Sequence, residues 1–186
     1  MNYHVRHEKQ VVNAQLICFV LASIFSFTAD LFNSADPQII YKFVDSIFIT
    51  GTLLVAMKLA REGWDMPAAG YTLVSIAWGS LFLAKDFQQL SVGEDILASS
   101  FYFLLPAMIL IIFYEPFPWW LKIICIATIV PSLVGLIESK TGTPARVDPI
   151  WKKINYQAVH ITSLFWGVFF LLQHRKVKIA KEENPN

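Results

Sequence analysis

The chain has 186 residues, of which 55% are hydrophobic and 16% are charged, whereas an ordinary water-soluble domain has about 25% charged residues. Its net charge is +1, and its 15 Lys and Arg residues lie mostly at the ends of apolar runs. This pattern gives no basis for a nucleic-acid partner. The composition excludes an ordinary soluble domain and predicts an integral membrane protein in contact with a lipid bilayer.

Apolar runs of spanning length follow one another along the whole chain. About 20 residues cross a hydrocarbon core of about 30 Å, so this length allows about six spans with short loops. We predict an all-α integral membrane protein, a compact bundle of six transmembrane helices. Pro106 and Pro131 lie inside spans and are expected to kink them. In chain order the predicted spans are 11–32, 39–60, 68–84, 95–114, 120–137 and 154–173.

These spans form a single predicted transmembrane domain, residues 11–173. An N-terminal tail (1–10) precedes it and a charged C-terminal tail (174–186) follows it. An even number of spans places both tails on the same side of the membrane. Most of the Lys and Arg residues then lie on that side, so the positive-inside rule predicts a multi-pass protein of the cell membrane with cytoplasmic termini.

The second and third predicted spans carry the signals for helix packing. At 3.6 residues per turn, Lys42, Asp45 and Thr52 share one helical face. Because buried charge is costly in lipid, this face should point into the bundle. Ser75 and Gly79 have the spacing at which small residues let two helices approach closely.

The polar residues that are costly to bury gather at one depth, in the half of the bundle away from the termini. Helical spacing there lets His160 look into the same space as Asp45. We predict a polar pocket open to the non-cytoplasmic side, with acidic and imidazole groups as polar contacts and aromatic rings as walls. The candidate ligand-binding residues are Asp30, Asp45, Tyr102, Tyr156, His160 and Trp166.

The same residues also have a purely structural interpretation. Charges near helix ends, such as Lys42, Lys85 and Asp86, can extend to the membrane interface. Asp45 can pair with Lys42 on its own helix, and His160 can bond to a hydroxyl. Under this interpretation the charges are ties between helices, and the protein needs no ligand.

Patterns that would indicate catalysis or a cofactor are weak. Zinc needs three or four ligands and haem normally takes two axial ligands, whereas His160 is the single histidine inside a span. No GxSxG, HExxH, Walker A or GxGxxG pattern occurs. We therefore predict neither a metal nor a cofactor, and we favour a protein that is not an enzyme.

Three functional hypotheses follow from these observations. The first is a protein that binds or transports a small solute through the polar pocket. The second is a non-catalytic assembly or regulatory subunit, whose partner is another membrane protein. The third is a membrane enzyme acting on a lipid, in which Asp45 and His160 form an acid and base pair.

Overall fold

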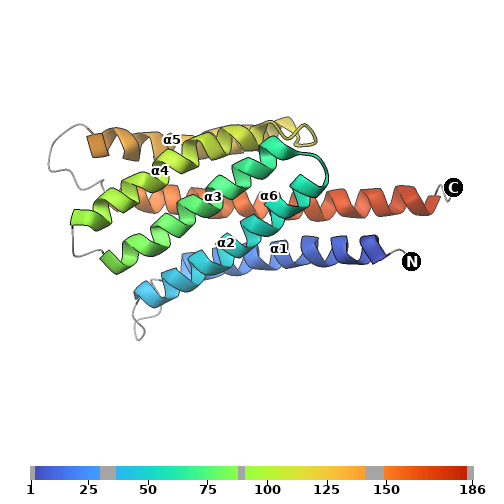
Figure 1. Cartoon of the computed structure of the whole chain (residues 1–186), viewed down its shortest axis with the longest axis horizontal. Coiled ribbons are helices and arrows are strands. Elements are labelled where there is room, and N and C mark those ends of the chain that lie inside the picture. Colours follow the sequence, from blue (N-terminus) through green and yellow to red (C-terminus); the bar gives the residue numbers. More distant parts are fainter. Residues whose placement is uncertain (1–2, 30–36, 88–90, 141–148, 184–186) are drawn as a thin grey trace.

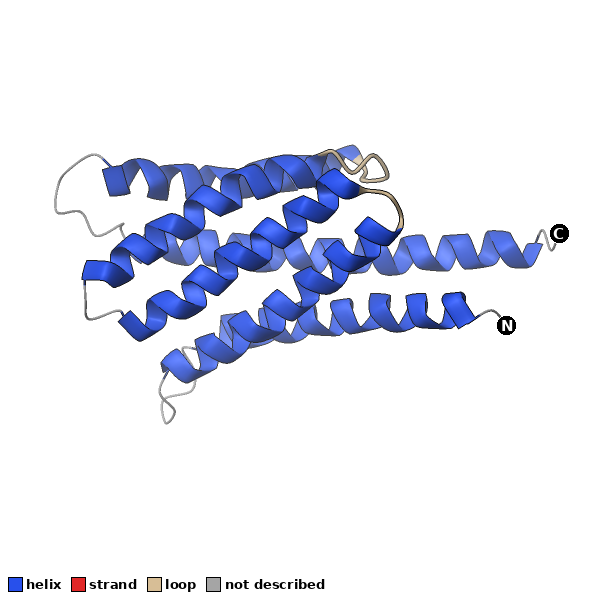
Figure 2. Ribbon diagram, viewed as in Figure 1, coloured by secondary structure: helices blue, strands red, loops and turns tan. Residues whose placement is uncertain are grey.

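The computed structural model describes residues 3–29, 37–87, 91–140 and 149–183. Within these ranges the chain forms six α-helices and one 3-10 helix, with no strand (Figure 2). In chain order these elements are α1 (Tyr3–Thr28), α2 (Pro37–Arg61), α3 (Asp65–Ala84), the 3-10 helix η2 (Lys85–Phe87), α4 (Ser91–Ile112), α5 (Trp119–Lys140) and α6 (Pro149–Glu183). The prediction of an all-helical bundle of six helices is confirmed.

The six α-helices pack as a closed ring. Each helix contacts its neighbours in sequence, and α6 closes the ring by packing against both α5 and α1. Figure 1 shows both chain ends at the same end of the bundle, where α1 and α6 extend beyond the other helices. We call this the termini end, and the opposite end, which holds the start of α2 and η2, the far end.

Among the helices that the structure describes, three are long and apolar enough to cross a membrane, judged by length and composition. They provide the candidate spans Glu8–Thr28, Ile39–Arg61 and Asp65–Ala84. Two shorter apolar stretches, Ser99–Ile112 and Trp119–Val134, lie in α4 and α5. Length and composition thus give three candidate spans, while six spans remain a prediction.

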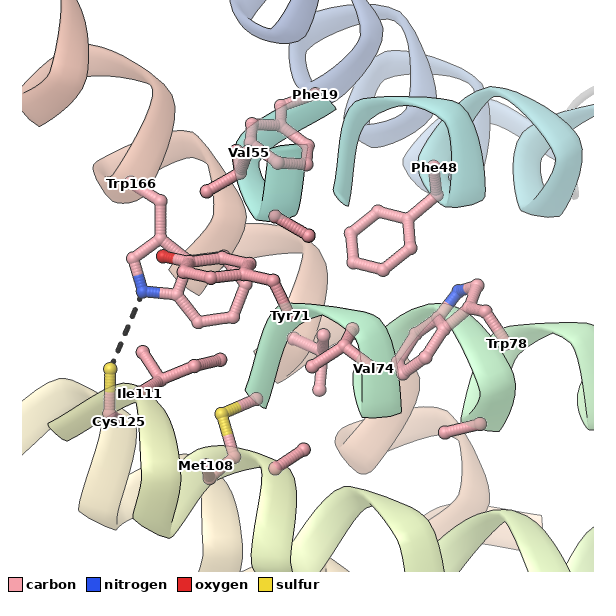
Figure 3. Packing of buried hydrophobic residues seen from close by; sticks show 14 of the residues in the cluster. Phe19, Phe48, Val55, Tyr71, Val74, Trp78, Met108, Ile111, Cys125 and Trp166 are labelled. Carbon is pink, nitrogen blue, oxygen red and sulfur yellow. Dashed lines mark hydrogen bonds between the residues drawn. The ribbon is translucent and has the colours of Figure 1, made fainter. Parts of the chain in front are cut away.

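An aromatic core fills the centre of the ring (Figure 3). Phe19 of α1, Phe48 of α2, Tyr71 of α3 and Trp166 of α6 are all fully buried. The rings of Tyr71 and Trp166 meet edge to face, with centroids 4.9 Å apart, which is a favourable arrangement for two aromatic rings. Trp166 Nε1 also donates a hydrogen bond to Sγ of Cys125 on α5, 3.4 Å away. The core therefore holds helices from opposite sides of the ring together.

A glycine sets the turn between α2 and α3. Gly63 has a φ of 80°, in the left-handed region that favours glycine. Its N–H donates to the carbonyl of Ala60 at 3.2 Å, and the N–H of Trp64 donates to the carbonyl of Leu59 at 2.9 Å. This pair of bonds closes the last turn of α2 as a Schellman motif. It allows α3 to begin immediately and to pack against α2.

The close approach between α3 and α4 occurs at a different glycine from the one that the spacing predicts. A Cβ on Gly70 would lie 2.8 Å from the carbonyl oxygen of Ala107 and 3.0 Å from the backbone nitrogen of Ile111. A Cβ on Gly79 would meet nothing within 4 Å. The expectation for Gly79 was therefore wrong, because spacing alone does not say which face of α3 meets another backbone.

Buried hydroxyl groups join neighbouring helices elsewhere in the ring. The hydroxyls of Thr52 on α2 and Ser75 on α3 lie 2.7 Å apart, so Ser75 does contribute to helix contact. Each of these hydroxyls also bonds to a carbonyl of its own helix, Thr52 to Phe48 and Ser75 to Tyr71. Hydroxyls satisfied in both ways can be buried at low cost.

Candidate functional site

Asp45 of α2 forms a buried ion pair at the far end of the ring. Its side chain has no exposed surface, and the Lys85 ammonium at the start of η2 donates to Oδ2. The hydroxyl of Tyr156 on α6 donates to Oδ1 at 2.8 Å. One carboxylate therefore joins α2, η2 and α6. Because both oxygens accept charge-assisted or polar hydrogen bonds, burial of this anion is compensated.

A second ion pair lies beside the first and is more exposed. The Lys42 ammonium donates to Oδ1 of Asp86, and their side chains are 28% and 48% exposed. The expected pair of Lys42 with Asp45 on the same helix was therefore wrong. Lys42 and Asp45 of α2 each pair with the opposite charge on η2, because Lys85 and Asp86 follow α3 directly and reach both. This arrangement gives an outer pair near the surface and an inner pair within the bundle.

Aromatic rings pack around Tyr156, which bonds to the Asp45 carboxylate of the inner ion pair. His160 lies 4.6 Å from the Tyr156 ring, 4.9 Å from Phe48 and 5.9 Å from Trp78, measured between centroids. Phe48 and Trp78 are themselves 4.6 Å apart. We use the name Asp45 cluster for Asp45, Lys85 and these four aromatic residues. Four elements, α2, α3, η2 and α6, supply its side chains.

Polar atoms at the inner end of the cluster have no hydrogen-bond partner among the described residues. These atoms are Nδ1 and Nε2 of His160, which is fully buried, and Nε1 of the fully buried Trp78. Such a group costs about 1–3 kcal/mol when it is left unpaired. Buried orphan groups are rare in native proteins and call for an explanation such as a bound molecule. Here three such atoms belong to the rings of His160 and Trp78, which contact each other.

Other orphan polar atoms lie outside this cluster. The Tyr71 hydroxyl and both polar atoms of the Gln15 side chain also have no partner among the described residues. Tyr71 packs against Trp166 and Phe170, which are not members of the cluster. An orphan hydroxyl alone therefore does not identify a site. What distinguishes His160 and Trp78 is their contact with Tyr156, whose hydroxyl bonds to the buried carboxylate of Asp45.

The structure brings together three of the six candidate residues, namely Asp45, Tyr156 and His160. Trp166 lies elsewhere in the core, six residues or about 9 Å along α6 from His160, against Tyr71. Tyr102 lies on α4 and is 47% exposed. Asp30 lies outside the described residues.

Three residues of the cluster were missed by sequence reasoning, namely Lys85, Trp78 and Phe48. Lys85 was expected to extend outward, whereas its side chain is 13% exposed and pairs with Asp45. Trp78 lies seven residues before Lys85, two turns along one helical face, and this spacing could have indicated it. Lys85 could also have been identified from its position. It follows the end of α3, and this end lies beside the first turns of the antiparallel helix α2, which contain Asp45.

The arrangement does not provide the acid and base pair of the enzyme hypothesis. The described hydrogen bonds of the Asp45 carboxylate come from Lys85 and Tyr156, and within the described part of the chain neither ring nitrogen of His160 has a partner. Among the residues that the structure describes, no three His, Cys, Asp or Glu side chains form a group that could hold a metal. The His160 and Trp78 nitrogens are groups that can form hydrogen bonds with another polar group.

The fold and the site together define a class, a helical bundle with three candidate membrane spans and a charged pair buried inside it. No protein-family model, no curated protein and no solved structure gives a significant match to the chain. Its function is therefore inferred from the arrangement of its own residues.

Proposed function

We propose that this chain is a multi-pass membrane protein that binds a small polar solute at the Asp45 cluster. The observation that carries the proposal is the set of nitrogens on His160 and Trp78 that have no partner among the described residues, on two rings packed against Tyr156, which bonds to the buried Asp45. Neutral imidazole offers one donor and one acceptor, and indole offers one donor. A solute with a hydrogen-bonding group would satisfy these atoms, and the protein would recover the free energy that their burial costs.

Membrane insertion of the bundle is supported by its outer surface as well as by its candidate spans. Large apolar side chains remain exposed on the helices, among them Ile24 on α1, Met57 on α2 and Ile109 on α4. Such extensive exposed apolar surface suits contact with lipid. Ionisable residues buried inside a membrane bundle commonly mark solute or ion sites, which is the setting that we propose for Asp45.

The polar groups also suggest the side from which the solute enters. From the surface inward, the outer pair of Lys42 and Asp86 comes first, the inner pair of Lys85 and Asp45 follows, and His160 lies behind Tyr156. The exposed fraction of the side chains falls in the same order, from the outer pair to the inner pair to the fully buried His160. We therefore place the entrance at the far end, which is non-cytoplasmic if the termini are cytoplasmic.

A co-purified solute provides the first test of this proposal. We expect the detergent-purified wild-type chain to release a small polar molecule on heat denaturation, detectable by mass spectrometry. His160→Leu should release about tenfold less, because a lost hydrogen bond to a buried group costs about 1.4 kcal/mol or more. Tyr71→Phe removes an orphan hydroxyl outside the cluster and should release as much as the wild type.

Two results would contradict the proposal. One is a wild-type chain that releases no such molecule, and the other is equal release from wild type and His160→Leu. Either result would favour the second hypothesis, a packing subunit, because the ion pair of Asp45 with Lys85 is complete without a ligand.

A further inference from the structure

We infer that the solute carries an organic ammonium group. Without the solute, the ammonium group of Lys85 occupies the same place beside Asp45, and the solute displaces it. This inference rests on the proposed binding function and names the chemical class of its ligand. It comes from the surroundings of one atom, Nζ of Lys85.

Nζ of Lys85 is surrounded by the groups that recognise organic cations. It pairs with the fully buried carboxylate of Asp45. It also lies 5.3 Å from the ring centroid of Tyr41 and 5.6 Å from that of Tyr156. The two tyrosine rings meet edge to face, 5.8 Å apart. A carboxylate with aromatic faces within about 6 Å is the arrangement that binds ammonium ligands.

The position of Lys85 in the chain suits an occupant that can leave. It belongs to the short helix η2 rather than to the interior of a long helix. Its four-carbon stem is flexible, and its side chain is already 13% exposed. Movement of this side chain toward the surface would therefore need no rearrangement of the α-helices.

Exchange of one ammonium group for another conserves the charge pair. Asp45 keeps a cationic partner throughout, so the large cost of leaving a buried carboxylate unpaired is avoided. The orphan nitrogens of His160 and Trp78 lie just beyond Tyr156. They could bond to a second polar group of the solute. The ligand class is thus a small organic ammonium ion that also carries a hydrogen-bonding group.

The test uses the full chain in detergent and n-propylammonium chloride as the probe. Lys85→Ala removes three carbons and the ammonium group, which n-propylammonium replaces. We expect the probe to raise the unfolding temperature of Lys85→Ala in a saturable manner. The wild type should respond at concentrations at least about tenfold higher, since Lys85 competes for the same position. Asp45→Asn/Lys85→Ala should not respond, because it offers no carboxylate.

Sodium chloride and 1-propanol are the matched controls for ionic strength and for the propyl chain. The inference is overturned if Lys85→Ala gains no more from the probe than from these controls, if the double variant gains as much, or if the wild type does not respond at all. If Lys85→Ala does not fold, the shift in unfolding temperature that the probe causes is compared between the wild type and Asp45→Asn, which lacks the carboxylate. If release of a solute depends on His160 but the protein does not respond to the ammonium probe, the binding function is retained and the ammonium class is rejected.

Discussion

Replacing Lys85 by Ala is expected to lower the free energy of unfolding by about 3–5 kcal/mol. The reason is the partner that remains, since the Asp45 side chain has no exposed surface and would lose its counter-ion. Thermal or denaturant unfolding of the detergent-purified chain measures the loss. The cost comes from an uncompensated buried charge rather than from the contacts of the lysine stem.

Two variants separate this explanation from a general effect of losing a lysine. Lys42→Ala removes the same residue type from the neighbouring pair, where both side chains are partly exposed, and should cost less than about 1 kcal/mol. Asp45→Asn/Lys85→Met removes both charges and should recover most of the stability that Lys85→Ala loses. A double variant as unstable as Lys85→Ala would show that the buried charge is not the cause.

The second large effect is expected at the contact between α3 and α4. Gly70→Ala should destabilise the chain by about 1–3 kcal/mol. The new methyl group would lie 2.8 Å from the carbonyl oxygen of Ala107 and 3.0 Å from the backbone nitrogen of Ile111. Backbone atoms cannot turn aside as a side chain can, so the two helices must separate. The midpoint of thermal unfolding reports the effect.

Gly79→Ala is the matched control on the same helix. Its added methyl group would meet nothing within 4 Å, and alanine stabilises a helix interior relative to glycine by about 0.5–1 kcal/mol. We therefore expect Gly79→Ala to be neutral or slightly stabilising. Equal loss of stability in Gly70→Ala and Gly79→Ala would refute the assignment of the close contact to Gly70.

The helices could be predicted from the sequence because each apolar run is bounded by turn-forming residues. The predicted span 39–60 is observed as Pro37–Arg61, between a proline and the turn at Gly63. The tails were less predictable. Helix α1 begins at Tyr3 and α6 ends at Glu183, because neither charged segment contains Gly or Pro within these bounds. Polarity alone does not end a helix.

Part of the candidate site could also be predicted, for a specific physical reason. Helical periodicity places Asp45 and His160 on faces that turn inward, and the structure buries both. Periodicity does not give the rotation and height of one helix relative to another. These determine that Asp45 meets Lys85 rather than Lys42, and that Trp78 rather than Trp166 lies against His160.

The most direct test of the binding site is thermal unfolding of wild type, His160→Leu and Tyr71→Phe in the presence of neutral, anionic and ammonium-bearing small solutes. Our account predicts that at least one solute raises the unfolding temperature of wild type and Tyr71→Phe with increasing concentration. The same solute should have little effect on His160→Leu. Identical responses of all three proteins to every solute would contradict a binding site at the Asp45 cluster.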